Sequence, residues 1–318
     1  MRTALTDLVG IEQPILLAPM GHVSGGRLAA AVSDAGGLGL IGAGYGDADW
    51  LHREFQRAGR ARIGIGFITW ALARNPSLLD LALDYAPEAV MFSFGDYTPF
   101  LNQVRAAGAK VICQVQTLAQ AQDAAAAGVD LIVAQGTEGG GHGGERSTLS
   151  LVPAVVDAVA PTPVIAAGGI ADGRGLAAAH MLGAAGALIG TRFFASKEAL
   201  GSTNAKHVIV KSRGDATLRT RVFDIVRDYA WPIHITGRVP LNRFAAQWHG
   251  REAGLSADLT RQRAIYRRAE QRGDTDTIVV FAGEAVDLID TIEPAARIVE
   301  RITREADDLV GASSLTKQ

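Results

Sequence analysis

Short apolar runs that alternate with alanine-rich stretches constrain the fold of this chain more than any other feature. Segments of helical character, such as residues 25–34, 118–127 and 173–182, separate the runs. The runs are continuously apolar, as expected of strands buried on both faces of a parallel sheet. Eight such βα units favour a TIM barrel over the competing doubly wound sheet. The runs span residues 15–18, 38–41, 63–68, 89–92, 111–115, 131–134, 164–167 and 187–189.

The alternation stops after the eighth run. Residues 196–275 are rich in Arg, Asp and Gln, show no βα rhythm and contain Trp231 and Trp248. We interpret them as an added helical subdomain in which the aromatic residues serve packing. The apolar segment 278–284 and the helical spacing of 295–309 predict a return to the barrel. We therefore expect a barrel formed by residues 1–195 and 276–318, and a helical cover formed by residues 196–275.

Composition argues against several classes of function. The 31 basic and 33 acidic residues give a net charge of −2, so nothing electrostatic favours a nucleic acid or an anionic membrane as partner. The single cysteine, Cys113, lies in an apolar run, which predicts a core residue and argues against a disulfide or a cysteine metal site. No apolar stretch approaches the roughly 18 residues of a membrane span. We expect a soluble, cytoplasmic protein without a bound metal that acts on a small molecule.

Chemically unusual residues follow six of the eight runs, where a parallel barrel places its active site. The most informative is the loop 135–144, in which five of the six glycines directly flank His142. Glycine permits close approach of the backbone to a ligand, so we expect an active-site loop; the alternative is a flexible turn with an incidental histidine. The other five segments are residues 19–22, 69–70, 93–95, 168–172 and 190–192.

The glycines after the seventh and eighth runs predict a phosphate site. Gly168, Gly169 and Gly190 stand where barrel enzymes bind a phosphate through backbone N–H groups and the start of a short helix. The chain has neither the Gly-Lys-Ser/Thr ending of a Walker loop nor a convincing dinucleotide fingerprint. The phosphate should therefore belong to a mononucleotide cofactor or substrate.

Five motifs together resemble those of the nitronate monooxygenase family, formerly called 2-nitropropane dioxygenases. They occur in the family's order and at roughly its spacing, and the resemblance covers most of the chain. The glycine–histidine loop is the most specific of them, whereas Ala-Pro-Met and Gly-Gly-Ile recur in many flavin barrels. The motifs are Ala-Pro-Met-Gly at 18–21, Ala-Val-Ser-Asp-Ala-Gly-Gly-Leu-Gly at 31–39, Ala-Gln-Gly-Thr-Glu-Gly-Gly-Gly-His at 134–142, Ala-Ala-Gly-Gly-Ile-Ala at 166–171 and Gly-Thr-Arg-Phe at 190–193.

The resemblance implies a TIM barrel that binds FMN without a covalent bond. It places the Met20 backbone near the reactive edge of the flavin, Gln135 and Gly140 beside the ring, and the phosphate on Gly168, Gly169, Gly190 and Thr191. The chain departs from the family at Thr69, where many members have asparagine, and at Gln114, where a basic residue can occur. The full set of expected cofactor contacts is Ala18, Pro19, Met20, Thr69, Gln114, Gln135, Gly140, Gly141, Gly168, Gly169, Gly190 and Thr191.

His142 is the expected catalytic residue. A neutral imidazole can accept a substrate's α-proton near pH 7 before the flavin takes electrons. The resemblance completes the reaction: a nitronate is oxidised one electron at a time, dioxygen reoxidises the flavin, and a carbonyl compound and nitrite leave. Propionate 3-nitronate and neutral nitroalkanes are candidate substrates. Glu138 either orients the loop or faces solvent, and His22 is a weaker candidate for a substrate contact.

Three alternatives stay open at this stage, as does the oligomeric state. An FMN-dependent enoyl-acyl-carrier-protein reductase or an NAD(P)H:quinone reductase would use the same kind of barrel with a pyridine nucleotide as donor. A noncatalytic nucleotide-binding barrel belongs to another class, but such a protein has little use for an imidazole facing the ring. Fold alone does not choose among them, because related barrels host many chemistries.

Overall fold

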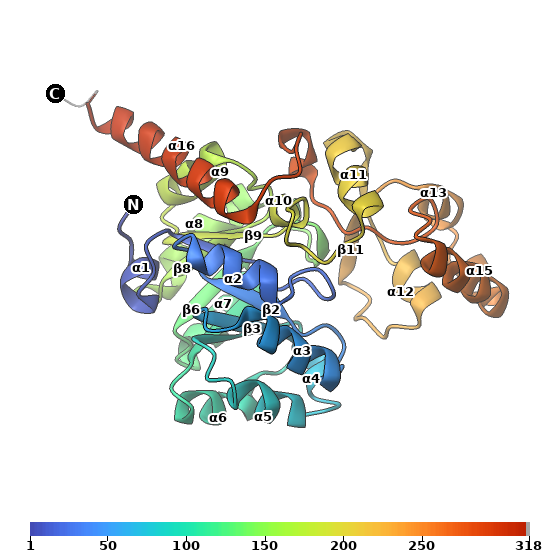
Figure 1. Cartoon of the computed structure of the whole chain (residues 1–318), viewed down its shortest axis with the longest axis horizontal. Helices are drawn as coiled ribbons and strands as arrows, with labels where there is room; N and C mark the ends of the chain where they lie inside the picture. The colour runs from blue at the N-terminus through green and yellow to red at the C-terminus, as the bar shows by residue number, and fades with distance from the viewer. Residues whose placement is uncertain (316–318) are drawn as a thin grey trace.

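Eight parallel strands form a barrel in the computed structural model, which describes residues 1–315 (Figure 1). The hydrogen-bonded order is β1-β9-β8-β6-β5-β4-β3-β2, and a bridge between Leu16 and Leu38 joins the two ends of this sheet. All eight expected strands are confirmed, and with them the TIM barrel. The strands are β1 (Ile15–Leu17), β2 (Gly39–Gly42), β3 (Ile63–Ile68), β4 (Ala89–Ser93), β5 (Lys110–Val115), β6 (Leu131–Gln135), β8 (Val164–Ala167) and β9 (Gly186–Ile189).

Helices surround the barrel, and the strands are buried on both faces, which explains their continuously apolar sequences. One set of strand side chains, including Ile41, Phe92 and Ile132, packs outward against the helices, and Cys113 is buried among them as expected. The helices are α1 (Ala4–Val9), α2 (Gly26–Asp34), α3 (Ala48–Ala58), α4 (Thr69–Leu72), α5 (Ser77–Leu83), α6 (Leu101–Ala106), α7 (Leu118–Ala126), α8 (Thr148–Val159), α9 (Gly173–Met181), α10 (Thr191–Phe194) and α16 (Ala295–Leu315), with the 3-10 turn η1 (Thr98–Phe100).

The opposite set of strand side chains fills the barrel interior. Leu40, Met91 and Val133 belong to this inner cluster, and Leu5 of α1 packs into the same cluster. The interior is thus a packed core, as in other barrels of this type, and the open end for a ligand lies at the C-terminal ends of the strands.

The C-terminal segment returns to the barrel. Helix α16 packs against α9 and α2, with Ile298, Val299 and Ile302 fully buried, and it lies alongside them in Figure 1. Residues 278–283 form no strand; they run across the mouth of the barrel, where the N–H of Gly283 donates to Thr191 Oγ1 at 3.0 Å. The turn η3 (Glu284–Leu288) connects this crossing to the final helix.

The segment 196–275 contains two strands besides the expected helices, and most of it extends to one side of the barrel (Figure 1). Strand β11 pairs with β10 and also with β7 (Gly141–Gly143), a strand formed by the glycine–histidine loop, so that Gly237 lies opposite His142. Phe223, Phe244 and Tyr266 form a separate hydrophobic core. The elements are α11 (Thr203–Lys211), η2 (Gly214–Ala216), β10 (Thr217–Thr220), α12 (Val222–Arg227), β11 (Thr236–Pro240), α13 (Arg243–Trp248), α14 (Glu252–Ala257) and α15 (Leu259–Arg272).

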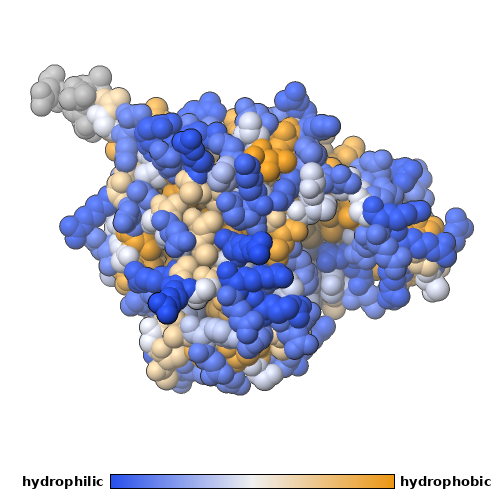
Figure 2. Space-filling model, viewed as in Figure 1, coloured by the Kyte–Doolittle hydropathy of each residue, from blue (hydrophilic) through white to orange (hydrophobic). Residues whose placement is uncertain are grey.

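Hydrophilic residues cover most of the face shown in Figure 2, over the barrel and over the added segment alike. Within residues 1–315, none of the helices has the combination of length and apolar character needed to cross a bilayer.

Candidate functional site

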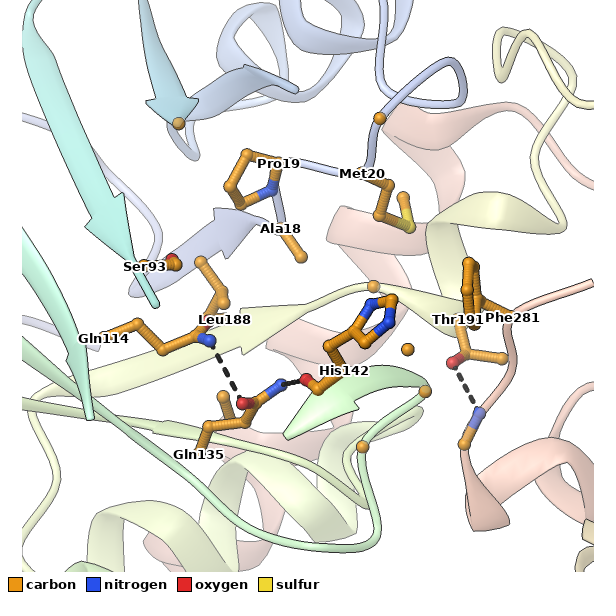
Figure 3. A pocket seen from close by; sticks show the side chains of 18 of the residues that line it. Ala18, Pro19, Met20, Ser93, Gln114, Gln135, His142, Leu188, Thr191 and Phe281 are labelled. Atoms are coloured by element: carbon orange, nitrogen blue, oxygen red, sulfur yellow. Dashed lines mark hydrogen bonds between the residues drawn. The ribbon is translucent and has the colours of Figure 1, made fainter. Parts of the chain in front are cut away.

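A cavity opens at the C-terminal ends of the barrel strands, between the barrel and the segment 196–275 (Figure 3). Loops that follow β1, β4, β6, β8 and β9 reach it, as the sequence predicted. All but one of the thirteen predicted site residues line this cavity. They are Ala18, Pro19, Met20, Gln114, Gln135, Gly140, Gly141, His142, Gly168, Gly169, Gly190 and Thr191.

Thr69 is the exception. Helix α4 begins at Thr69 directly after β3, and its side chain turns inward, where it is fully buried against the Gly95 turn. Its Oγ1 has no hydrogen-bond partner among the described residues. The preceding residue, Ile68, lines the cavity instead, so strand β3 offers an apolar side chain rather than the polar contact expected at Thr69.

Glutamine side chains hold the glycine–histidine loop against the barrel. The Gln135 side-chain carbonyl accepts hydrogen bonds from the amides of Gln114 and Gln116, both at 3.0 Å, and its own amide donates to the His142 backbone carbonyl at 3.0 Å (Figure 3). Both ends of the Gln135 amide are therefore occupied by protein. Gln135 fixes the position of the His142 backbone.

Free backbone donors gather at the ends of β8 and β9. The N–H groups of Gly168, Gly169, Gly190 and Thr191 make no hydrogen bond within the described chain. Gly168 and Gly169 have φ angles of +104° and +73°, and a Cβ on Gly168 would lie 2.9 Å from the Gly136 carbonyl oxygen. Unused N–H groups on glycine backbone at the start of a helix are suited to a phosphate.

The loop after β1 forms another wall of the cavity. Pro19 packs so tightly against Gly66 of β3 that a Cβ there would lie 2.2 Å from Pro19 Cγ. The N–H of Met20 donates to Ser24 Oγ at 2.6 Å, so Met20 presents its side chain, not its N–H, to the cavity. The close packing fixes Ala18, Pro19 and Met20 as a rigid apolar surface on which a planar ligand could lie.

His142 forms a hydrogen-bonded pair with Asp224 of helix α12. His142 Nε2 lies 2.9 Å from Asp224 Oδ1, and the two side chains are only 8% and 5% exposed. A carboxylate can only accept, so the hydrogen of a neutral His142 sits on Nε2. Nδ1 then carries a lone pair, and it has no hydrogen-bond partner in residues 1–315. The pair has the arrangement of a general base held by a carboxylate.

Burial lowers the pKa of His142 below its ordinary 6.5, and the hydrogen bond that His142 donates to Asp224 opposes this effect. The imidazole is therefore neutral at pH 7 and can accept a proton.

Aromatic rings enclose the imidazole. Trp231 stacks on it with ring centroids 3.6 Å apart, and Phe281 lies 5.2 Å away on the crossing segment. The indole N–H of Trp231 donates to the Tyr45 hydroxyl at 3.1 Å. Phe94, which has a φ of +61°, packs edge-on against Trp231. These rings cover part of the imidazole and form an apolar wall beside it.

The nitronate monooxygenase family profile matches residues 2–62 and 70–305 of this chain. The chain belongs to that family. The break at residues 63–69 includes Thr69, the residue at which the sequence departs from the family pattern and the one that lies outside the cavity.

Proteins that are similar to this chain carry different names. Nitronate monooxygenase npaC of Metarhizium robertsii is 34% identical over 330 residues, which cover 92% of this chain and 90% of that protein. A protein of Rhodococcus jostii named (3aS,4S,5R,7aS)-5-hydroxy-7a-methyl-1-oxo-octahydro-1H-indene-4-carboxyl-CoA dehydrogenase is 30% identical over 340 residues, 96% of each chain. The structure of FabK from Thermotoga maritima superimposes with a TM-score of 0.87 and 34% identity over 99% of both chains.

Two side chains that the sequence left ambiguous have definite places in this family member. The Glu138 carboxylate accepts hydrogen bonds from the Thr148 N–H at 2.9 Å and from its hydroxyl at 2.8 Å, so it ties the glycine loop to the start of α8. It orients the loop, one of the two roles considered. His22 lines the cavity while remaining solvent-exposed, and it packs edge-on against Trp50.

Sequence reasoning missed the contribution of the added segment to the site. Asp224 was not considered, Arg227 was not considered, and Trp231 was assigned to packing, yet Asp224 bonds the base and the other two line the cavity. Trp248, also assigned to packing, does lie in the separate core of this segment. One signal could have found these residues: Asp224, Arg227, Tyr229 and Trp231 place four polar or aromatic side chains close together in the sequence.

No group of three or more potential metal ligands occurs within the described part of the chain.

Proposed function

We propose that this protein oxidises alkyl nitronates with FMN and dioxygen, giving a carbonyl compound and nitrite. The observation that carries the proposal is the buried His142–Asp224 pair, whose free Nδ1 lies in the same cavity as the unused backbone donors of β8 and β9. Membership of the nitronate monooxygenase family and the relative named nitronate monooxygenase support it.

The residues of the cavity fit FMN. The phosphate would be held by the backbone N–H groups of Gly168, Gly169, Gly190 and Thr191. A Cβ on Gly190 would lie 3.5 Å from Met20 Sδ and would take up room in the cavity that a ligand needs. Ala18, Pro19 and Met20 would support the flavin ring. Bound FMN supplies an acceptor for the substrate's electrons that dioxygen can reoxidise.

The chain's own contribution is to move and hold a proton. Nδ1 of His142 takes the α-proton of a neutral nitroalkane, and the hydrogen on Nε2 remains shared with Asp224, whose carboxylate stabilises the imidazolium. A preformed nitronate has already lost this proton. Trp231 and Phe281 flank the imidazole and would confine the substrate.

Anaerobic mixing of the FMN-loaded protein with alkyl nitronates, with propionate 3-nitronate and with NADH tests the proposal. We expect both nitronates to bleach the flavin absorbance rapidly and NADH to do so slowly or not at all. Rapid bleaching by NADH together with inert nitronates would contradict the proposal and favour an NAD(P)H-dependent reductase. A purified protein without affinity for flavin would contradict both nitronate oxidation and the reductase activity.

A second candidate is redox chemistry on a coenzyme A thioester, favoured by the Rhodococcus jostii relative, whose name describes a carboxyl-CoA dehydrogenase. The same anaerobic experiment with an acyl-CoA added separates it. Flavin bleaching or reoxidation that requires the thioester, without a response to nitronates, would favour this second function.

A further inference from the structure

Two arginines lie side by side behind the strand that carries His142. Arg219 of β10 and Arg238 of β11 are directly opposite each other, and strand alternation turns both side chains to the face of the sheet away from the imidazole. Like charges in this arrangement destabilise a pair of strands. Arg238 pairs with Glu284 at 2.8 Å, whereas Arg219 has no carboxylate within ion-pair distance in residues 1–315. The hydrogen bonds of the two arginines show what offsets their repulsion.

Both guanidinium groups hold the turn of the glycine–histidine loop. Arg219 Nη1 and Arg238 Nε donate to the same carbonyl oxygen, that of Thr137, at 3.0 and 2.9 Å. Arg219 also donates from Nε to the Thr236 hydroxyl at 2.9 Å and from Nη2 to the Thr236 carbonyl. A Cβ on Gly143 would lie 3.1 Å from Arg219 Nη2, so the guanidinium lies directly against β7. Arg219 thus contacts the loop near its beginning and near its end.

Three charged side chains act on the imidazole of His142. Asp224 and Arg227 lie on α12 and Arg219 lies behind the strand, whereas the aromatic rings packed on the imidazole are uncharged. Burial has the largest effect and lowers the pKa of His142, the hydrogen bond to Asp224 raises it, and the two arginines lower it further. Burial also lowers the pKa of Arg219 to about 10, which leaves the guanidinium charged at neutral pH. The charge of Arg219 therefore opposes protonation of His142.

We infer that Arg219 is a positioning residue for the catalytic base: its guanidinium holds the glycine–histidine loop in place, and its charge behind β7 keeps the imidazole free to accept a proton. The inference rests on the proposed function, in which His142 removes the α-proton of a nitroalkane. A base that is already protonated cannot do so. Arg219 is not among the residues that line the cavity, so it acts only through His142 and its loop.

Two substitutions separate the charge of Arg219 from its geometry. Arg219→Gln removes the charge and leaves an amide that can donate to the Thr137 carbonyl. His142 should then take up a proton at higher pH, and the acid-side decline of kcat/KM for a nitroalkane should move to higher pH. Arg219→Lys keeps the charge but loses the planar fork, so the decline should stay in place. Both should lower nitroalkane turnover by roughly tenfold, less than the ~10²-fold that a misplacement of about 1 Å can cost.

Arg238→Gln is the matched control. Arg238 donates to the same Thr137 carbonyl from the opposite strand, but it pairs with Glu284 and is not among the charges that act on His142. The variant should loosen the loop and lower turnover without moving the acid-side decline. Equal shifts of the decline in Arg219→Gln and Arg238→Gln would reduce the effect to loosening of the loop and overturn the inference.

An NMR titration of the histidine Cε1–H signals in the FMN-loaded protein makes the test independent of turnover. The chain has seven histidines, and His142→Asn identifies the signal of His142. We expect Arg219→Gln to move the midpoint of this signal to higher pH and Arg219→Lys to leave it at the wild-type position. An unmoved midpoint in Arg219→Gln would overturn the inference. The expected midpoints in a protein that turns over no nitroalkane would contradict the proposed function and still support the action of Arg219 on His142.

Discussion

The two regions that meet at the cavity contribute to it in different ways. The barrel presents backbone: four unused N–H groups at the ends of β8 and β9, and the tightly packed Ala18-Pro19-Met20 segment. The segment 196–275 presents side chains: the carboxylate of Asp224, the guanidinium of Arg227 and the indole of Trp231. Backbone donors recognise a phosphate whatever it is attached to, whereas side chains distinguish substrates. We infer that the barrel, which also carries His142, would hold the proposed cofactor, and that the added segment supports the base through Asp224 and sets the specificity.

Replacement of His142 by Asn should have the largest effect. Turnover of a neutral nitroalkane should fall by roughly 10²- to 10⁴-fold, since the proton acceptor is lost, while preformed nitronates should be affected much less. Steady-state kinetics on a nitroalkane and on its own nitronate measure the two losses. Equal losses on both would assign His142 to binding or to positioning of the flavin.

Asp224→Asn tests whether the added segment supplies part of the catalytic machinery. The amide removes the charge that stabilises the imidazolium and can bind the wrong tautomer. Nitroalkane turnover should therefore fall by about 10- to 100-fold, less than the roughly 10²- to 10⁴-fold loss expected when the base itself is removed.

The pH profile distinguishes a role of Asp224 in tuning the base from a role in packing alone. In the wild type, kcat/KM for a nitroalkane should be at its plateau at pH 7 and decline only on acidification below 6.5, because burial lowers the pKa of His142. Asp224 raises that pKa, so Asp224→Asn should move the decline to lower pH. A lower plateau without any movement of the decline would make Asp224 a packing residue.

Gly190→Val tests the proposed contribution of the barrel, which is to bind the FMN phosphate. Its side chain would point toward Ala18 and Met20, so FMN should bind about tenfold more weakly or worse, and Gly169→Val should act similarly because its φ is +73°. Flavin content after purification and titration of the apoprotein measure the effect. Gly254→Val, on the exposed helix α14, is the control. Full flavin occupancy in both cavity variants would contradict the placement of the FMN phosphate at this site.

Trp231→Ala should produce the smallest change and sharpen the division between the two regions. We expect the segment 196–275 to limit substrate size, and Trp231 is its residue at the cavity wall. The variant should accept longer alkyl nitronates severalfold better relative to short ones, with flavin content unchanged. Shortening residues 237–254 would be a poor test, because Gly237 pairs with His142. An unchanged size preference in a folded, flavin-loaded variant would show that Trp231 does not limit substrate size.

The barrel and the free backbone donors at the ends of β8 and β9 were predictable because their signals are local. Strands buried on both faces read as apolar runs, and glycines follow both the seventh and the eighth run, where barrel enzymes commonly bind a phosphate, so Gly168, Gly169 and Gly190 stood out. The added segment carries no such signal. Strands β10 and β11 read Thr-Leu-Arg-Thr and Thr-Gly-Arg-Val-Pro, which lack a clear apolar pattern, and α12 has only six residues. The hydrogen bond from His142 to Asp224 depends on tertiary contact between distant segments. Thr69 misled because its neighbour Ile68, not Thr69 itself, faces the cavity.

The pairing of β7 with β11 also bears on the order in which the parts of the site form during folding. The phosphate donors are complete once the eight strands have closed, because none of them comes from residues 196–275. The strand that carries His142 finds its partner only when the later-made β11 has docked beside it, and Asp224 arrives with the same segment. Contacts between distant segments are slow to form because their loops must close first. A chain in the course of assembly would thus have its backbone donors in place before His142 is paired with Asp224.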